Sequence, residues 1–285
     1  MPKTYNDLYL ETRRAFREAG IEAYSIEARL ITAFAAEKPI EKFIRDLRLY
    51  AGDETAERLR GMVARRLSGE PAAYITGAWE FYGLPLEVDR TVLIPRSDTE
   101  VLVDAALENL RGRKMDARVL DLCCGSGCVG CAVAHELPAT RVVMADISTD
   151  ALHISRINAR LNGLSPRITC IELDATEPPP MLIGTFDIIL CNPPYIPTAD
   201  ILELDSSVRD YEPVWALDGG EDGLTFYRAV TKNWKDLLRP GGALLFEVGE
   251  DQAGDVKQFM TDAGFKNVSG VFDTAGIERV ITGNI

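Results

Sequence analysis

The sequence predicts an α/β fold: a doubly wound, mostly parallel sheet preceded by a small helical bundle. Three observations lead to this prediction. Residues 1–70 show only helical periodicity, whereas from about residue 96 short apolar runs alternate with helical patterns. A glycine-rich turn joins one apolar run to a helix, and two acids and an asparagine follow three further runs. Since ligands bind at the carboxyl ends of parallel strands, these turns mark the predicted site.

Composition narrows the class of protein. With 285 residues, 46% hydrophobic and 26% charged, the chain can bury one large and one small core. The formal net charge is -13, which opposes attraction to a phosphate backbone, so we expect no direct, specific binding of nucleic acid. Residues 1–75 carry 13 basic and 12 acidic side chains, so the negative charge falls on the remainder. A protein is therefore the expected partner.

The sequence shows no sign of secretion or of a metal site. No apolar stretch reaches the roughly 18 residues of a membrane span, and the start of the chain lacks the apolar region of a signal peptide. We expect a cytoplasmic protein with no membrane association. The six cysteines are not spaced as a disulfide framework or as paired zinc ligands, which predicts free thiols and no bound metal.

Residues 1–75 form the predicted helical domain. A first apolar stripe ends before Gly20, a second begins with Ser25 as its N-cap, and a third stops at Gly69. Residues 76–95 follow as a hairpin connector, because aromatic and β-branched residues are interrupted there by Gly77 and Gly83.

Residues 96–285 form the predicted sheet domain. Five strands are expected at residues 118–122, 142–146, 168–173, 186–191 and 243–249, alternating with helices. Two further segments, 268–272 and 278–281, are expected to pair as antiparallel strands at the end of the chain. These seven strands make a Rossmann-like sheet.

The first predicted turn is rich in glycine. Gly125 and Gly127 permit a close ligand approach that a Cβ would block, and the next helix offers free N–H groups. Asp146 lies about 20 residues further on, where a nucleotide ribose is expected, and Asp174 with Ala175 follows the third strand, near the expected adenine position. The glycines at 125, 127 and 130 also fit a dinucleotide fingerprint, so a nicotinamide-dependent dehydrogenase stays open. Either acid could instead be a turn residue.

The fourth turn has a different chemistry. Asn192, Pro193, Pro194 and Tyr195 follow a buried strand, and two prolines lack N–H donors. The Asn192 side-chain oxygen and the Pro193 carbonyl could accept both protons of a planar NH2 group, while the Tyr195 ring covers its face. The fitting target is an amide or the exocyclic amine of a base, although the same residues also suit a stiff strand-exit turn.

Together these turns resemble class I S-adenosylmethionine-dependent methyltransferases, and specifically the family of peptide chain release factor glutamine N5-methyltransferases. Segments outside the site carry the same resemblance: 69–71 (Gly-Glu-Pro), 80–84 (Glu-Phe-Tyr-Gly-Leu), 93–96 (Leu-Ile-Pro-Arg), 211–213 (Tyr-Glu-Pro) and 218–224 (Asp-Gly-Gly-Glu-Asp-Gly-Leu). In this family the glycine loop commonly reads Asp-x-Gly-x-Gly-x-Gly, and here Cys123 stands for its first glycine.

The resemblance implies a fold, a cofactor and a substrate. The fold is a seven-stranded methyltransferase sheet with a helical substrate-docking domain. The cofactor is S-adenosylmethionine, with contacts implied at Cys123, Cys124, Gly125, Ser126, Gly127, Asp146, Asp174, Ala175 and Asn192. The catalytic loop is Asn192 to Tyr195. The implied substrate is the glutamine of the Gly-Gly-Gln motif in class 1 release factors. Glutamine methylation of a ribosomal protein and adenine N6 methylation stay open as alternatives.

Overall fold

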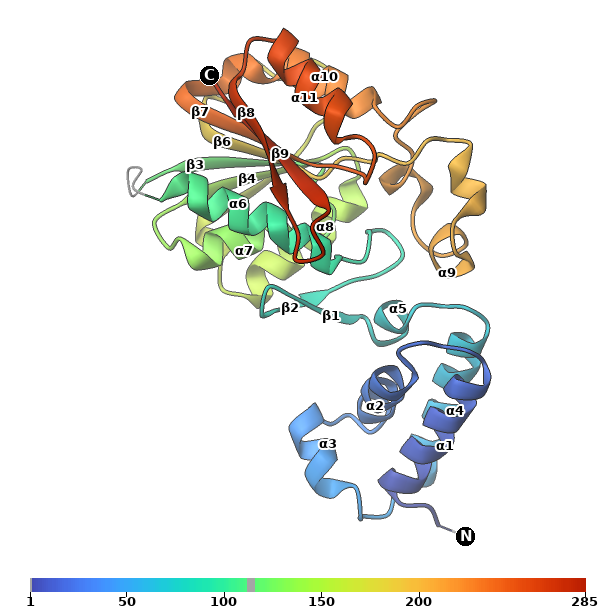
Figure 1. Ribbon diagram of the computed structural model, residues 1–285. Helices are drawn as coiled ribbons and strands as arrows, with labels where there is room; N and C mark the ends of the chain where they lie inside the picture. The colour runs from blue at the N-terminus through green and yellow to red at the C-terminus, as the bar shows by residue number, and fades with distance from the viewer. Residues whose placement is uncertain (1, 112–115) are drawn as a thin grey trace. The chain divides into compact units, whose positions relative to one another are not determined.

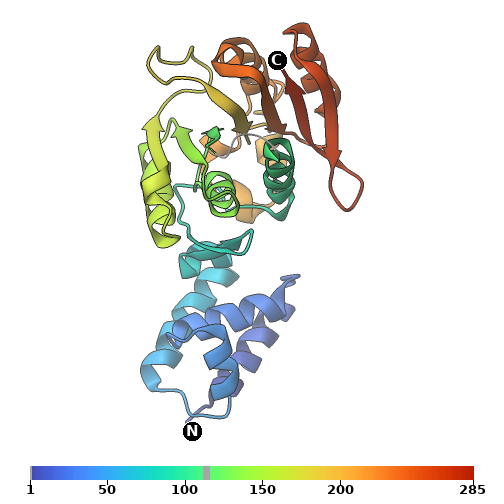
Figure 2. The ribbon, with the colours of Figure 1, turned by 90° about the vertical axis from the view of Figure 1, so that its left-hand side faces the viewer.

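The computed structural model describes residues 2–111 and 116–285. It divides into two compact units, one that runs to Gly77 and includes Ser206–Tyr211, and one that comprises Ala78–Asp205 and Glu212–Ile285. Figures 1 and 2 show the helices of the first unit and the sheet of the second unit from two directions. The short segment 206–211 joins the first unit although it lies far along the chain from it.

The first unit is a bundle of short helices. They are α1 (Tyr5–Glu18), α2 (Tyr24–Ala35), α3 (Ile40–Asp46), α4 (Asp53–Leu67), α5 (Ala72–Thr76) and the single turn α9 (Ser206–Arg209). Thr4 and Asp7 form a capping box that satisfies free N–H groups at the start of α1. Apolar side chains at helical spacing form the core: Leu8, Phe16, Ala28, Ile31, Leu59 and Ile75.

Two details of this bundle differ from the sequence prediction. The N-cap of α2 is Ala23, with no side-chain hydrogen bond to the helix, so the assignment of Ser25 as the cap was wrong. Ser25 lies in the first turn, and its hydroxyl shares a 3.1 Å hydrogen bond with the hydroxyl of Tyr9 on α1. The contact between two helices thus uses the side chain that the sequence assigned to capping. The short helices α3, α5 and α9 were not predicted.

The second unit opens with a hairpin of β1 (Ala78–Phe81) and β2 (Leu84–Glu87). Its two turn residues, Tyr82 and Gly83, both have positive φ, at 52° and 73°. This is the backbone of a type I′ turn, whose twist matches that of paired strands. Phe81 is buried in the main core, so it packs the hairpin against the sheet domain.

A seven-stranded sheet follows, in the order β5-β4-β3-β6-β7-β9-β8. Its strands are β3 (Arg118–Leu122), β4 (Arg141–Asp146), β5 (Ile168–Glu172), β6 (Phe186–Cys191), β7 (Leu238–Glu247), β8 (Lys266–Phe272) and β9 (Glu278–Asn284). The strands from β5 to β7 are parallel, and β9 pairs antiparallel with both β7 and β8. The predicted doubly wound, Rossmann-like sheet with seven strands is confirmed.

Helices cover both faces of this sheet (Figure 1). Residues of α6 (Glu100–Leu110), α7 (Cys128–Glu136) and α8 (Thr149–Leu161) share one buried cluster with one face. Residues of α10 (Thr225–Asn233) and α11 (Ala253–Asp262) share a second cluster with the other face. Because both faces are buried, the central strands read as continuous apolar runs.

Strand β7 begins at Leu238, five residues before the predicted start. Its pairing with β6 passes from Phe186↔Leu238 to Ile188↔Ala243, so an irregular stretch lies between these two pairs. That stretch reads Arg-Pro-Gly-Gly, which the sequence presents as a turn. The Arg239 guanidinium Nη1 donates to Asp187 Oδ2 at 2.6 Å, which ties the bulged stretch to β6.

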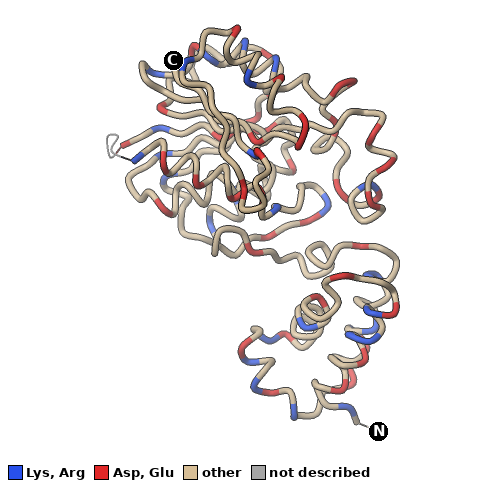
Figure 3. Tube along the Cα trace, in the orientation of Figure 1, with Lys and Arg blue, Asp and Glu red and all other residues tan. Residues whose placement is uncertain are grey.

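Charge is distributed unevenly along the chain (Figure 3). Residues 200–222 contain eight acidic side chains and one basic side chain.

Across residues 2–111 and 116–285, no helix has both the length and the apolar character needed to cross a membrane.

Candidate active site

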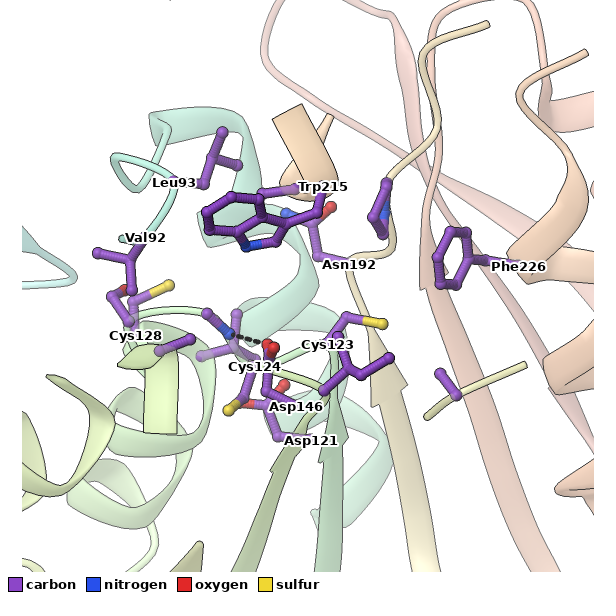
Figure 4. Close-up of a pocket in the computed structure, with 18 of the residues that line it drawn as sticks. Val92, Leu93, Asp121, Cys123, Cys124, Cys128, Asp146, Asn192, Trp215 and Phe226 are labelled. Carbon is purple, nitrogen blue, oxygen red and sulfur yellow. Dashed lines mark hydrogen bonds between the residues drawn. The ribbon is translucent and has the colours of Figure 1, made fainter. Parts of the chain in front are cut away.

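A cavity of about 420 Å³ lies at the carboxyl ends of β3, β4 and β6. This volume is within the range of small-molecule binding sites. Figure 4 shows Asp121 and Asp146 at one side of the cavity and Asn192 and Trp215 at another. The lining includes nine of the residues that the sequence singled out: Cys123, Cys124, Gly125, Ser126, Asp146, Asp174, Ala175, Asn192 and Pro194. Three others, Gly127, Pro193 and Tyr195, lie outside this lining.

The backbone of the glycine loop is left-handed at alternate residues. Cys123 has φ 58° and Gly125 has φ 53°. A left-handed backbone favours glycine, which explains why related loops carry glycine where this chain has Cys123. A hydrogen bond with Cys191, together with burial, raises the pKa of the Cys123 thiol. The side chain is therefore a neutral thiol at the floor of the cavity.

Gly127 serves packing at the start of α7. It is the N-cap of that helix, with φ 76°. A Cβ added there would lie 3.0 Å from both Met144 Sδ and Ser155 Oγ. The side chain of Ser155 on α8 also donates to the Gly125 carbonyl at 2.8 Å, and Asn158 Nδ2 donates to the Ser126 carbonyl at 2.9 Å. Helix α8 therefore fixes the shape of the glycine loop.

Asp146 joins the end of β4 to the glycine loop. One carboxylate oxygen accepts from the backbone N–H of Gly125 at 2.9 Å (Figure 4), and the other accepts from that of Ser148 at 2.9 Å. Burial raises the pKa of this carboxyl, and these hydrogen bonds oppose the rise. A carboxylate has about four lone-pair sites, so Asp146 retains capacity to accept hydroxyl groups of a ligand.

Asp174 and Ala175 line the cavity and also shape their own turn. Asp174 Oδ1 accepts from the N–H and the hydroxyl of Thr176, at 2.8 and 2.6 Å. The Ala175 carbonyl accepts from Trp234 Nε1 at 2.9 Å. Asp174 therefore stabilises its own turn and also lines the cavity.

The loop after β6 presents hydrogen-bond acceptors. Asn192 Nδ2 donates to Thr99 Oγ1 at 3.3 Å. In the part of the chain that the structure describes, no group donates to Asn192 Oδ1 or to the Pro193 carbonyl. Tyr195 is held from behind, since Gln252 Nε2 donates to its carbonyl at 2.8 Å. Burial raises the pKa of the Tyr195 phenol to about 12, so its ring is neutral.

Glycines in the 218–224 segment allow this loop to pack tightly. A Cβ at Gly219 would lie 2.7 Å from Tyr195 Cα, and one at Gly223 would lie 2.4 Å from the Tyr195 carbonyl oxygen. The N–H of Ile196 donates to the Leu217 carbonyl at 2.9 Å. The segments 192–196 and 217–223, separate in sequence, therefore form one structural element.

A second pair of separate segments is joined beside the cavity. The Glu212 carboxylate accepts from the Arg96 guanidinium and, at 3.2 Å, from the backbone N–H of Ile94. This interaction joins segments 93–96 and 211–213, and Arg96 lines the cavity.

Sequence reasoning missed several side chains in and beside the site, including Thr99. Trp215 and Phe226 line the cavity, and Asp121 lies at its base. Asp121 and Glu247 are buried acids at strand ends, and burial raises the pKa of each carboxyl to about 7. A signal for both acids was present, because each stands in or directly after an apolar strand run. Neither Trp215 nor Phe226 had a local signal.

All six cysteines are free thiols. Among the described residues, no group of three His, Cys, Asp or Glu side chains has an arrangement that could hold a metal.

The strand order, the glycine loop after β3 and the acid after β4 define an S-adenosylmethionine-dependent methyltransferase. Comparison with known families agrees with this class. The methyltransferase small domain matches residues 98–203, and the PrmC N-terminal domain matches residues 7–77.

Relatives identify the family. A release factor glutamine methyltransferase of Geobacter sulfurreducens is 40% identical over 277 residues, which are 96% of this chain and 94% of the relative. One of Clostridium acetobutylicum is 34% identical over 275 residues, 96% of each chain. The chain belongs to the release factor glutamine methyltransferase family. Membership removes the dehydrogenase alternative.

A solved methyltransferase of Pyrococcus furiosus has the same fold. It is 17% identical, with a TM-score of 0.51 over 78% of this chain and 96% of that chain.

Proposed function

We propose that this enzyme transfers a methyl group from S-adenosylmethionine to the side-chain amide N5 of a glutamine, and that the glutamine belongs to the Gly-Gly-Gln motif of class 1 peptide chain release factors. The observation that carries the proposal is the position of Asn192. Its side chain lines the same cavity as the glycine loop and Asp146. The Asn192 amide and the proposed cofactor pocket thus share one space.

Features of the cavity support this choice of cofactor. Nothing lies within 4 Å of a Cβ placed on Gly125, so the backbone there is open toward the cavity. We assign the contacts of the methionine part to the loop from Cys123 to Gly127. We assign the ribose hydroxyls to Asp146 and the adenine to the region of Asp174 and Ala175, because their turn borders the cavity. When bound, S-adenosylmethionine supplies an electrophilic methyl group on a sulfonium.

The loop after β6 would bind and activate the amide. An amide nitrogen is a poor nucleophile because its lone pair is delocalised into the carbonyl. Asn192 Oδ1 and the Pro193 carbonyl would accept its two protons, which favours a pyramidal nitrogen and frees the lone pair. These acceptors are fixed dipoles on a rigid turn, so they need no reorganisation during the reaction. Pro194 and Tyr195 would frame the glutamine side chain.

The substrate assignment rests on family membership and on charge. The relatives at 34% and 40% identity are named for release factor glutamine methylation. The acidic segment 200–222 borders the cavity through Trp215 and Asp218, which favours a protein partner over a bare phosphate backbone. We assign the docking of that partner to the helical unit, and we place the enzyme in the cytoplasm.

The proposal is tested by methyl transfer from labelled S-adenosylmethionine to a purified class 1 release factor. A release factor with Gln→Ala in its Gly-Gly-Gln motif is the matched control. Transfer to the wild-type factor that disappears with the glutamine is the expected result. Equal labelling of both factors contradicts the assigned site. Labelling of a ribosomal protein or of adenine, with none on the release factor, replaces the substrate assignment by one of these alternatives.

A further inference from the structure

Glu247 is a buried acid beside the proposed catalytic loop. The last paired residues of β6 and β7 are Cys191 and Phe246, so the next residues, Asn192 and Glu247, are neighbours at the ends of two parallel strands. Leu190 and Leu245 both belong to the core cluster on the α6 face. Because strand side chains alternate between faces, Asn192 and Glu247 point to this same face.

The Glu247 carboxyl is enclosed. Glu247 is 4% exposed and Thr99 is 2% exposed. Burial raises the pKa of this carboxyl, whereas hydrogen bonding from the Thr99 and Asn192 side chains and the charge of Arg279 lower its pKa, and the charge of Asp98 raises it. Its Oε2 atom is buried and has no hydrogen-bond partner within the part of the chain that the structure describes. A carboxyl in this environment costs free energy that an apolar residue of similar size would not.

We propose that Glu247 and Thr99 are positioning residues that hold the Asn192 side chain in a single amide orientation. The 3.3 Å hydrogen bond commits Asn192 Nδ2 to Thr99 Oγ1. Since the oxygen and nitrogen of a planar amide point to opposite sides, Oδ1 is left facing the cavity. This inference rests on the proposed function, in which Oδ1 accepts a proton of the glutamine amide.

The orientation of the Asn192 side-chain amide determines whether it can accept a proton of the substrate amide. In the reversed orientation, Nδ2 would face the substrate NH2, and two donors would oppose each other. An Asn on a rigid turn fixes the position of the amide but not which end faces the substrate. A buried acceptor behind it resolves that choice, because a carboxyl group, ionised or neutral, keeps an oxygen that can accept hydrogen bonds from Nδ2 and from the Thr99 hydroxyl.

The test uses variants in the full chain with a release factor as substrate. Glu247→Met removes the acceptor at similar volume, and Thr99→Val removes the hydroxyl. Each should lower kcat by about 10-fold to 100-fold, with little change in the affinity for S-adenosylmethionine. Glu247→Gln keeps one acceptor oxygen and should lose less activity than Glu247→Met. Thr231→Val, on α10, is the matched control, because Thr231 is also a buried threonine and its kcat should stay unchanged.

A double-mutant cycle separates positioning from packing. If Glu247 acts through Asn192, Glu247→Met should have no further effect on kcat when Asn192 is already Ala. Equal losses in both backgrounds, or a Glu247→Met kcat within 2-fold of wild type, overturn the inference. Wild-type transfer to the glutamine is measured first. Absence of wild-type product refutes the proposed function and the inference together, whereas normal wild-type product with unaffected variants refutes the inference alone.

Discussion

Asp121 predicts a pH dependence of stability in the ligand-free protein. Its side chain is buried, and burial raises its pKa to about 7, while the hydrogen bond from the Gly130 N–H acts in the opposite direction. In an unfolded chain the same carboxyl titrates near pH 4. Between these two values the folded state holds a proton that the unfolded state has released. The free energy of unfolding therefore falls as pH rises through this window.

The size of the effect follows from the two pKa values. Each unit of pKa difference corresponds to about 1.4 kcal/mol, so Asp121 alone should lower the free energy of unfolding by about 2 to 3 kcal/mol between pH 5 and pH 8. Asp121→Asn removes this titration but keeps an oxygen to accept from the Gly130 N–H, which lies 2.9 Å from Oδ2. The stability of the variant relative to wild type should therefore rise by about 2 to 3 kcal/mol from pH 5 to pH 8.

The free energy of unfolding of wild type and of Asp121→Asn is measured by urea titration at pH 5 and at pH 8, without cofactor. Subtracting wild type from the variant cancels other groups that titrate in this range, including Glu247. Asp222→Asn is the control, because its ion pair with Arg228 lowers the pKa of Asp222 to about 2, so its difference from wild type should not change between the two pH values. A difference between Asp121→Asn and wild type that stays constant with pH refutes the reasoning.

Three further outcomes are expected. Asn192→Ala should lower kcat by about 10² to 10³, with cofactor affinity measured separately by calorimetry; an unchanged kcat would remove this side chain from the chemistry. Gly130→Ala places a Cβ 2.6 Å from the Cε atom of a neighbouring methionine and should lower the free energy of unfolding in urea by about 1 to 3 kcal/mol. Gly61→Ala is the control, because nothing lies within 4 Å of a Cβ at that position, and it should not destabilise the protein. Similar unfolding midpoints for both variants would contradict the close packing around Gly130. Trp215 is 56% exposed and lines the cavity. Addition of the cofactor should therefore change the intrinsic fluorescence of the Trp79→Phe variant, which keeps Trp215, but not that of the Trp215→Phe variant. An equal change in both variants would exclude Trp215 as the reporter.

The sheet was predictable because its central strands are buried on both faces. Such strands appear as apolar runs whatever their neighbours are, and the polar residues after β4, β5 and β6 stand out against them. The ends of elements were harder. The early start of β7 was missed because its bulged stretch contains proline and two glycines, and the N-cap of α2 was misplaced because Ser25 bonds to Tyr9 instead.

The site was predictable where one segment carries the chemistry, and not where distant segments meet. The glycine loop and the turn after β6 each have a local sequence signature. Together with the turns after β4 and β5, they supply the nine predicted residues that line the cavity. Thr99 becomes part of the site only because α6 packs on the end of β6. Trp215 lies in a short 3-10 turn with no apolar periodicity. Such contacts arise from tertiary packing, which a single sequence does not display.

The topology also sets how a bound ligand affects the rest of the domain. The lining of the cavity draws on segments from Thr91 to Phe226, and β3 pairs with β6 although more than sixty residues separate them. The two sides of the cavity are joined through the paired central strands, so global opening of the sheet also disrupts the cavity. A ligand at 100 times its Kd should therefore add about 2.7 kcal/mol to the free energy of global opening. Hydrogen exchange would then slow together across β3, β4 and β6, and not only in the loops that contact the ligand.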